Sequence, residues 1–199
     1  EQSGFISNMG YEAYQNVLLS AVQELRNEMF TDLYKNDQDI DTGEKYVLDT
    51  SVDSDLELFF PPDYVPNDSE RILLYKEMDS MEEDEQIEPF RARLIDRFGQ
   101  IPWEAEELIR IVLLRHRAKK LGIERITLKV GKMILHLMKD QESTYYQSEA
   151  FDKLLRYVST QYRYVQLREI NGKRSVAISG MDTVVKAVAV LDDILNITL

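Results

Sequence analysis

The sequence predicts an α+β fold, in which a long N-terminal helical arm precedes a compact domain of about five helices packed with small antiparallel hairpins. Apolar residues recur with a 3.6-residue period in the helical segments, beginning with the stripe from Tyr14 to Met29. Two pairs of short strand-like runs flank turns that contain glycine, which is typical of hairpins. A composition of 44% hydrophobic and 30% charged residues supports a folded chain.

The chain divides into three regions. Residues 1–35 form the helical arm, and residues 36–44 are a polar, acidic linker. Residues 45–199 contain the compact domain. Because the arm carries one apolar stripe, it needs another surface to pack on, and the chain starts at Glu1 without an initiator methionine. We therefore interpret the chain as a fragment of a larger protein.

The compact domain begins with a strand. Apolar and polar residues alternate over residues 46–58, and Pro61 ends the strand because proline cannot donate to a ladder. The alternation places three apolar residues on one face: Val52, Leu56 and Leu58.

Two helices follow the strand. Asn67 or Asp68 is expected to cap the first. Ser80 and Glu83 fit a capping box for the second, which would then kink at the later proline; alternatively, this helix begins near Ile87 with the proline in its first turn.

The next helix begins after Pro102 and ends near Lys120. Acidic residues in its first turns and lysines in its last turn complement the helix dipole. Its middle is apolar on nearly every side, so it should be the most buried helix of the domain. A hairpin around Gly131-Lys132 follows it.

The C-terminal part contains two more helices and a second hairpin. A helix is expected around Phe151–Val158, and a hairpin turns at Asn171-Gly172. The last helix covers residues 181–195, with Asp182 as its cap. Its inward-facing residues are expected to be Val184, Val185, Val188 and Leu191.

Charge and composition narrow the functional classes. The net charge of −12 argues against the whole molecule wrapping nucleic acid, but residues 1–100 carry a net −16 and residues 101–199 a net +4. The acidic half favours a basic protein partner. Without cysteine there is no disulfide or thiolate zinc site, and no apolar run approaches the roughly 18 residues of a membrane span. The composition fits a cytoplasmic protein.

Three groups of residues could carry chemistry. Asp53, Asp55 and Glu57 could bind a hard cation on one strand face, although such alternation more commonly marks the solvated face of an edge strand. His116 and His136 have no acid or thiol at a ligand spacing and are expected to be surface or packing residues.

Tyrosines beside basic residues in the second half could stack nucleic-acid bases, although tyrosine is also a common packing residue. The tyrosines are Tyr145, Tyr146, Tyr157, Tyr162 and Tyr164, and the basic residues are Arg156, Arg163, Arg168, Lys173 and Arg174. A nucleic-acid-binding α+β module over residues 145–174 is therefore the alternative function, and a metal-dependent enzyme is a third hypothesis.

One helical segment offers candidate contacts to a partner. Leu94, Ile95 and Phe98 are expected in the core, which turns Asp96 and Arg97 toward the open side. Spacing alone leaves two interpretations open. Arg97 could simply compensate the helix C-terminus beside an exposed Asp96, or both could contact a partner surface.

Several segments occur together in the order and spacing of one family. They are residues 60–66 (Phe-Pro-Pro-Asp-Tyr-Val-Pro), 71–76, 94–99, 101–102 and 120–123. With them, roughly residues 46–130 resemble the C-terminal domain of the bacterial transcription-repair coupling factor (Mfd). Residues 2–6 and 10–12 resemble the end of the translocation motif shared with the branch-migrating helicase RecG.

The resemblance implies a function. The parent would be an ATP-driven double-stranded DNA translocase that displaces stalled RNA polymerase and recruits UvrA. Its ATPase elements would lie upstream, so this region would be noncatalytic, with no cofactor or metal. In the family, the C-terminal domain is an autoinhibitory clamp on the N-terminal UvrA-binding module. Asp96 and Arg97 match clamp contacts, Arg93 stands where the family has an acid, and Gln2 matches the translocation element. Residues 1–35 would brace the motor domain.

Overall fold

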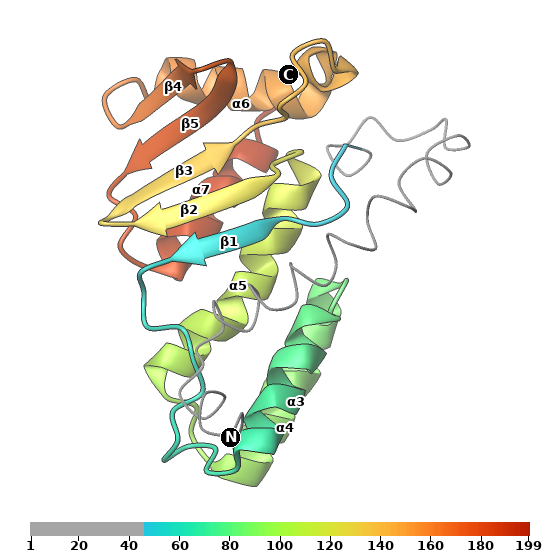
Figure 1. Cartoon of the computed structure of the whole chain (residues 1–199), viewed down its shortest axis with the longest axis vertical. Helices are drawn as coiled ribbons and strands as arrows, with labels where there is room; N and C mark the ends of the chain where they lie inside the picture. Colours follow the sequence, from blue (N-terminus) through green and yellow to red (C-terminus); the bar gives the residue numbers. More distant parts are fainter. Residues whose placement is uncertain (1–45) are drawn as a thin grey trace, which may run out of the picture.

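The computed structural model describes residues 46–199, which form a mixed α/β domain with a five-stranded sheet and five α-helices (Figure 1). The predicted number of helices is therefore confirmed, whereas the helical arm, the linker and Gln2 lie outside the described residues. The order of strands across the sheet is β1-β2-β3-β5-β4. The two predicted hairpins are thus joined edge to edge into one sheet, because β3 pairs with β5.

The sheet is mixed rather than wholly antiparallel. Strand β1 (Ser51–Ser54) runs parallel to β2 (Arg125–Lys129), and a crossover containing three α-helices joins them. The expected strand over residues 46–58 was too long, since only four of its residues pair. Its alternation nevertheless persists in burial, with Val52 and Leu58 in the core.

The crossover begins with a helical hairpin. Helix α3 (Asp68–Asp79) is capped by Asn67, whose side chain accepts from the backbone N–H of Glu70 at 3.0 Å. Helix α4 (Ile87–Phe98) follows a short 3-10 turn, η3 (Asp84–Gln86). The capping box predicted at Ser80 was wrong, because Ser80 ends α3 and a box forms instead between Glu83 and Gln86.

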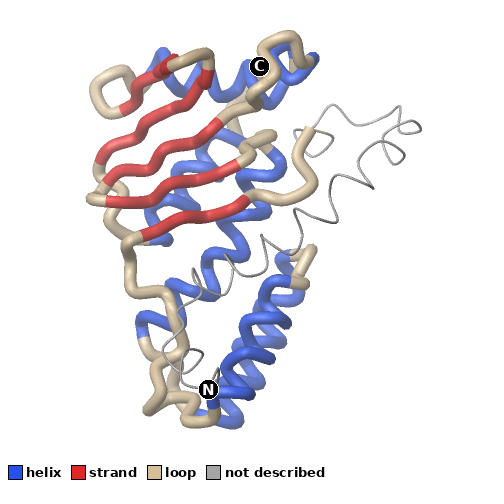
Figure 2. Tube along the Cα trace, in the orientation of Figure 1, coloured by secondary structure: helices blue, strands red, loops and turns tan. Residues whose placement is uncertain are grey.

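Helix α5 (Trp103–Lys120) runs through the middle of the domain (Figure 1). Half of its residues are buried, as its apolar middle predicts, and it packs against α7 (Val184–Leu195). Figures 1 and 2 show both helices behind the sheet. The cap of α7 is Thr183 rather than the predicted Asp182, and Val185 is 47% exposed, so its expected inward position was wrong.

Two hairpins and one helix complete the sheet. Strands β2 and β3 (Lys132–His136) turn at Val130-Gly131, one residue earlier than predicted, because both residues adopt positive φ. Helix α6 (Glu149–Thr160) follows the 3-10 turn η4 (Thr144–Gln147). Strands β4 (Val165–Ile170) and β5 (Lys173–Ser179) turn at Asn171-Gly172 as predicted.

Candidate interaction site

The α3–α4 hairpin carries the residues that sequence reasoning singled out. Arg97 pairs with Glu70 at 2.5 Å, and Arg93 pairs with Glu77, so two ion pairs join α4 to α3. Both arginine side chains are more than half exposed, and such pairs each stabilise a protein by about 1 kcal/mol or less. Arg97 also lies over the ring of Phe98, 5.3 Å from its centroid.

Asp96 is different from its neighbours. It is exposed, and its side chain makes no hydrogen bond or ion pair within residues 46–199. Ile95 beside it is 51% exposed, so its expected core position was wrong. The reason is helical geometry: Ile87, Phe90 and Leu94 complete the buried stripe of α4, and Ile95 is rotated about 100° away from Leu94. The outer side of α4 therefore presents an unpaired carboxylate next to an apolar side chain.

A second group of charged residues surrounds the C-terminal half of α5. Consecutive helical residues point about 100° apart, so Arg115, His116 and Arg117 reach three different elements. Arg115 is buried and donates to Asp79 and Asp49, at 2.8 Å in each case. Sequence reasoning missed this cluster, although a run of three basic residues in an otherwise apolar helix is a signal for buried ion pairs.

His116 and Arg117 share one carboxylate. His116 Nδ1 lies 2.7 Å from Asp84 Oδ1, and its Nε2 lies 2.9 Å from the Met81 carbonyl oxygen. Both ring nitrogens therefore lie within hydrogen-bond distance of an oxygen atom from the segment between α3 and α4. Arg117 donates to Asp84 and, at 2.6 Å, to Asp192 of α7. The histidine is thus a packing residue, as expected, but it has an acidic partner.

The pKa of the Asp84 carboxyl reflects this environment. Burial by itself would raise the pKa, but the hydrogen bonds and positive charges of His116 and Arg117 outweigh burial and hold it below its ordinary value. The carboxylate is consequently ionised at neutral pH. Asp84 ties η3 to α5, and Arg117 extends the same network to α7.

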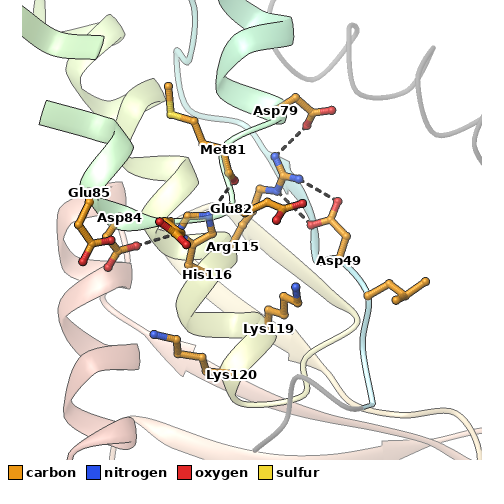
Figure 3. Close-up of a pocket in the computed structure, with 12 residues that line it drawn as sticks. Asp49, Asp79, Met81, Glu82, Asp84, Glu85, Arg115, His116, Lys119 and Lys120 are labelled. Atoms are coloured by element: carbon orange, nitrogen blue, oxygen red, sulfur yellow. Dashed lines mark hydrogen bonds and ion pairs between the residues drawn. The ribbon is translucent and has the colours of Figure 1, made fainter. Parts of the chain in front are cut away.

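Asp84, Arg115 and His116 line a pocket of about 480 Å³ (Figure 3). Acidic side chains of the loop between α3 and α4 form one wall, and Lys119 and Lys120 lie at the end of α5. Most of the central charges are engaged with one another, as the dashed lines in Figure 3 show. We interpret the cluster as an ion-pair network that holds α5 in place.

The three candidate metal ligands do not converge. Asp53 forms an ion pair with Lys129 at 2.5 Å, and Asp55 accepts from the backbone N–H of Val130 at 2.8 Å. Glu57 is exposed beyond the strand. Within residues 46–199, no three His, Asp or Glu side chains are grouped to hold a metal ion. The metal-site hypothesis therefore has no geometric support in this part of the chain.

The tyrosines do not form one exposed stacking surface. Tyr145 is fully buried, and its hydroxyl donates to the Leu121 carbonyl at 3.0 Å. Burial raises the pKa of Tyr145 well above its ordinary value. Tyr146 packs edge-on against Phe151, while Arg174 lies over the Tyr146 ring and pairs with Glu169. Of the five tyrosines, only two are exposed: Tyr162 and Tyr164.

The fold and the site define a mixed α/β domain whose ion pairs connect its helices and whose α3–α4 hairpin presents the unpaired carboxylate of Asp96. Comparison of the sequence and fold with known proteins identifies the family. Residues 54–148 match the TRCF domain, so the chain carries the C-terminal domain of a transcription-repair coupling factor, and the resemblance drawn from the sequence is confirmed.

Curated relatives and a solved structure agree with this assignment. A transcription-repair-coupling factor of Staphylococcus aureus (strain USA300) is 33% identical over 138 residues, which are 69% of this chain and 11% of the relative. Another from Rickettsia bellii (strain RML369-C) is 28% identical over 160 residues, which are 80% of this chain and 13% of the relative. The chain therefore spans a small fraction of the length of these relatives.

The fold matches the crystal structure of the C-terminal domain of a transcription-repair coupling factor, with a TM-score of 0.60 and 16% identity. The match covers 74% of this chain and 92% of the other. None of the helices among residues 46–199 is long and apolar enough to cross a membrane.

Proposed function

We propose that this chain is a noncatalytic regulatory domain that masks the N-terminal UvrA-binding module of its parent protein. The parent would be the cytoplasmic, ATP-dependent DNA translocase that displaces stalled RNA polymerase. Residues 1–35, with Gln2, would pack on its motor domain. The domain itself would need no cofactor. The observation that supports the proposal is Asp96, an exposed carboxylate without a partner in the described structure, beside the half-exposed Ile95.

Masking requires a contact that is strong enough to hold the closed state but weak enough to open. Coupling free energies between sites are typically about 1–3 kcal/mol, and a few central contacts can supply them. Asp96 can contribute fully to such a contact because no partner in residues 46–199 competes for it. Arg97 differs from Asp96, because its guanidinium already pairs with Glu70 and must either keep that ion pair or break it when the module binds.

Arg93 stands at a position where the family has an acidic residue, so its role in this chain has to be considered separately. Its ion pair with Glu77 gives it a structural partner within the hairpin. We therefore propose that Arg93 supports the hairpin, whereas Asp96 and Arg97 contact the masked module. On this basis, Arg93→Ala should weaken masking less than Asp96→Ala.

The test measures binding between this chain and the separately expressed N-terminal module by isothermal titration calorimetry. Asp96→Ala and Arg97→Ala should each weaken binding about tenfold, which corresponds to about 1.4 kcal/mol. Asp152→Ala and Arg156→Ala, two exposed residues of α6, are the matched controls and should leave binding unchanged. If the α4 variants bind as tightly as the controls, the masking surface lies elsewhere.

A further inference from the structure

One face of the sheet is open. The buried strand residues, which include Val52, Ile126, Leu135 and Val176, point toward α5 and α7. Because side chains alternate along a strand, their neighbours point to the opposite face. Figures 1 and 2 show no described helix in front of that face. Apart from the buried Ala177, the side chains that β2 to β5 place on this face are exposed or half-buried.

The strand register arranges these side chains in rows. Arg125 is opposite His136, His136 is opposite Ser175, and Ser175 is opposite Arg168, so one row crosses four strands. Lys129 and Lys132 form a second pair at the far end of the first hairpin. Lys173 begins β5 next to the first row. Neighbouring strands lie about 4.8 Å apart, so the row spans roughly 14 Å.

The positive charge on this face is largely uncompensated. The five basic residues are Arg125, Lys129, Lys132, Arg168 and Lys173. Asp53 on β1 pairs with Lys129. Within the described structure, the other four form no ion pair, and all four are exposed.

Polar groups suited to phosphate oxygens lie between the basic residues. Thr127 and Ser175 carry hydroxyls on this face, and Gln166 carries an amide. The pKa of His136 in the middle of the row is lowered, first by burial and then by the positive charges of Arg125 and Lys173, although Asp53 acts in the opposite direction. The lowered pKa is consistent with a positive potential at this point of the surface.

We propose that the open face of the sheet, with Arg125, Lys132, Arg168 and Lys173, binds the phosphate backbone of nucleic acid without reading its sequence. Charge complementarity supports a polyanion, because the four cations without an ion pair are spread over a broad face rather than gathered around one anion. Hydroxyl and amide donors between the cations favour phosphate oxygens as ligands. An acidic protein is the competing partner, and the experiment separates the two.

The surface differs from the masking surface on α4, so each proposal can fail alone. It also differs from the predicted tyrosine platform, because its cations come from four strands and it does not use Tyr145, Tyr146 or Tyr157. Lys173 and Arg168 are the residues common to both. The sheet register, which sequence spacing did not reveal, brings them next to Arg125 and Lys132.

The test uses the 199-residue chain and fluorescein-labelled 20-nucleotide probes, one single-stranded and one duplex, in fluorescence anisotropy titrations at 50–200 mM NaCl. With four phosphate contacts, the slope of log K against log salt should be about −2.8 for the single strand, which is about a 50-fold loss of affinity across this range. Arg125→Gln/Arg168→Gln should reduce the slope to about −1.4. Comparison of the two probes identifies the preferred form of nucleic acid.

Lys119→Gln/Lys120→Gln is the matched control, since it removes the same charge from the end of α5 and should leave the slope unchanged. The proposal is overturned if neither probe binds, or if both double variants change the slope equally. It is also overturned if polyglutamate binds and the nucleic-acid probes do not, which would identify an acidic protein. As a second measurement, the probe should raise the NMR-derived pKa of His136; binding without this change would place the ligand elsewhere.

Discussion

Among the glycines of residues 46–199, Gly122 is the one where an added methyl group should cost the most stability. It follows α5 with φ +67°, and a Cβ built there would lie 2.5 Å from Cε2 of Tyr145. The Tyr145 ring cannot easily move away from the added Cβ, because it is fully buried and packs on Phe151, and its hydroxyl donates a hydrogen bond to the Leu121 carbonyl. Gly122→Ala therefore combines a backbone penalty with an overpacked core.

The expected loss of stability for Gly122→Ala has two parts. The left-handed conformation costs a residue with a Cβ about 1–2 kcal/mol, and overpacking typically adds about 1–3 kcal/mol. Gly131→Ala is the matched control, since φ is +65° and no atom lies within 4 Å of the added Cβ. We expect a loss of about 2–5 kcal/mol for Gly122→Ala and about 1–2 kcal/mol for Gly131→Ala.

Urea unfolding followed by circular dichroism measures both losses. The difference between the two variants isolates the clash with Tyr145. Gly122→Ala combined with Tyr145→Phe tests only the hydroxyl and should remain destabilised, because the ring carbons make the clash. Equal losses for Gly122→Ala and Gly131→Ala would show that the Tyr145 ring moves freely and would refute the packing argument.

Three further changes test the charged network and the hairpin. Asp84→Asn should lower stability by about 1–2 kcal/mol at pH 7, a value reduced for its partial exposure. The folded-state pKa of Asp84 lies below its unfolded value of 3.8, so the loss should begin to shrink as pH falls below 3.8 and disappear only below the lower folded-state pKa, which thermal unfolding from pH 2 to 7 can follow. Glu107→Ala removes the buried carboxylate that accepts from the Val184 backbone N–H at 2.5 Å. This change should lower the free energy of unfolding, measured in urea, by about 2–3 kcal/mol, whereas Glu104→Ala should lower it little. Ile95→Asp should change the melting temperature by less than about 2 °C, since Ile95 is half exposed, and a large loss would place it in the core.

The sequence was sufficient for the local elements but not for their assembly. Helical periods and turn residues located the five α-helices and both hairpins of residues 46–199, because these signals depend on neighbours in the chain. The pairing of β1 with β2 depends on Val52 meeting Ile126, a contact across 74 positions that no local pattern specifies. The shift of the first turn to Val130-Gly131 likewise follows from the register of the paired strands.

The candidate sites show the same limit. The sequence correctly placed Asp96 and Arg97 on the open side of α4, because helix geometry determines the side of each residue. It could not show that Arg97 pairs with Glu70, nor that Arg115 lies between Asp49 and Asp79. Those partners come from other elements, and only the packing of the helices brings them together.

The charge asymmetry of the sequence has a different meaning in three dimensions. Asp49, Asp79 and Asp84 belong to the acidic half, but Arg115 and Arg117 of the basic half neutralise them. The net charges of −16 for residues 1–100 and +4 for residues 101–199 therefore do not correspond to one acidic and one basic surface, because residues of the two halves pair with each other.

Two of the surfaces that keep charges without an ion pair are separate from each other. Asp96 is left on the α3–α4 hairpin, while Arg125, Lys132, Arg168 and Lys173 are left on the open sheet face. Arg115 and Arg117 of α5 are already engaged in ion pairs within the domain, whereas the charges of these two surfaces are not. A domain of net charge −12 can thus present one surface suited to a protein and another suited to a polyanion.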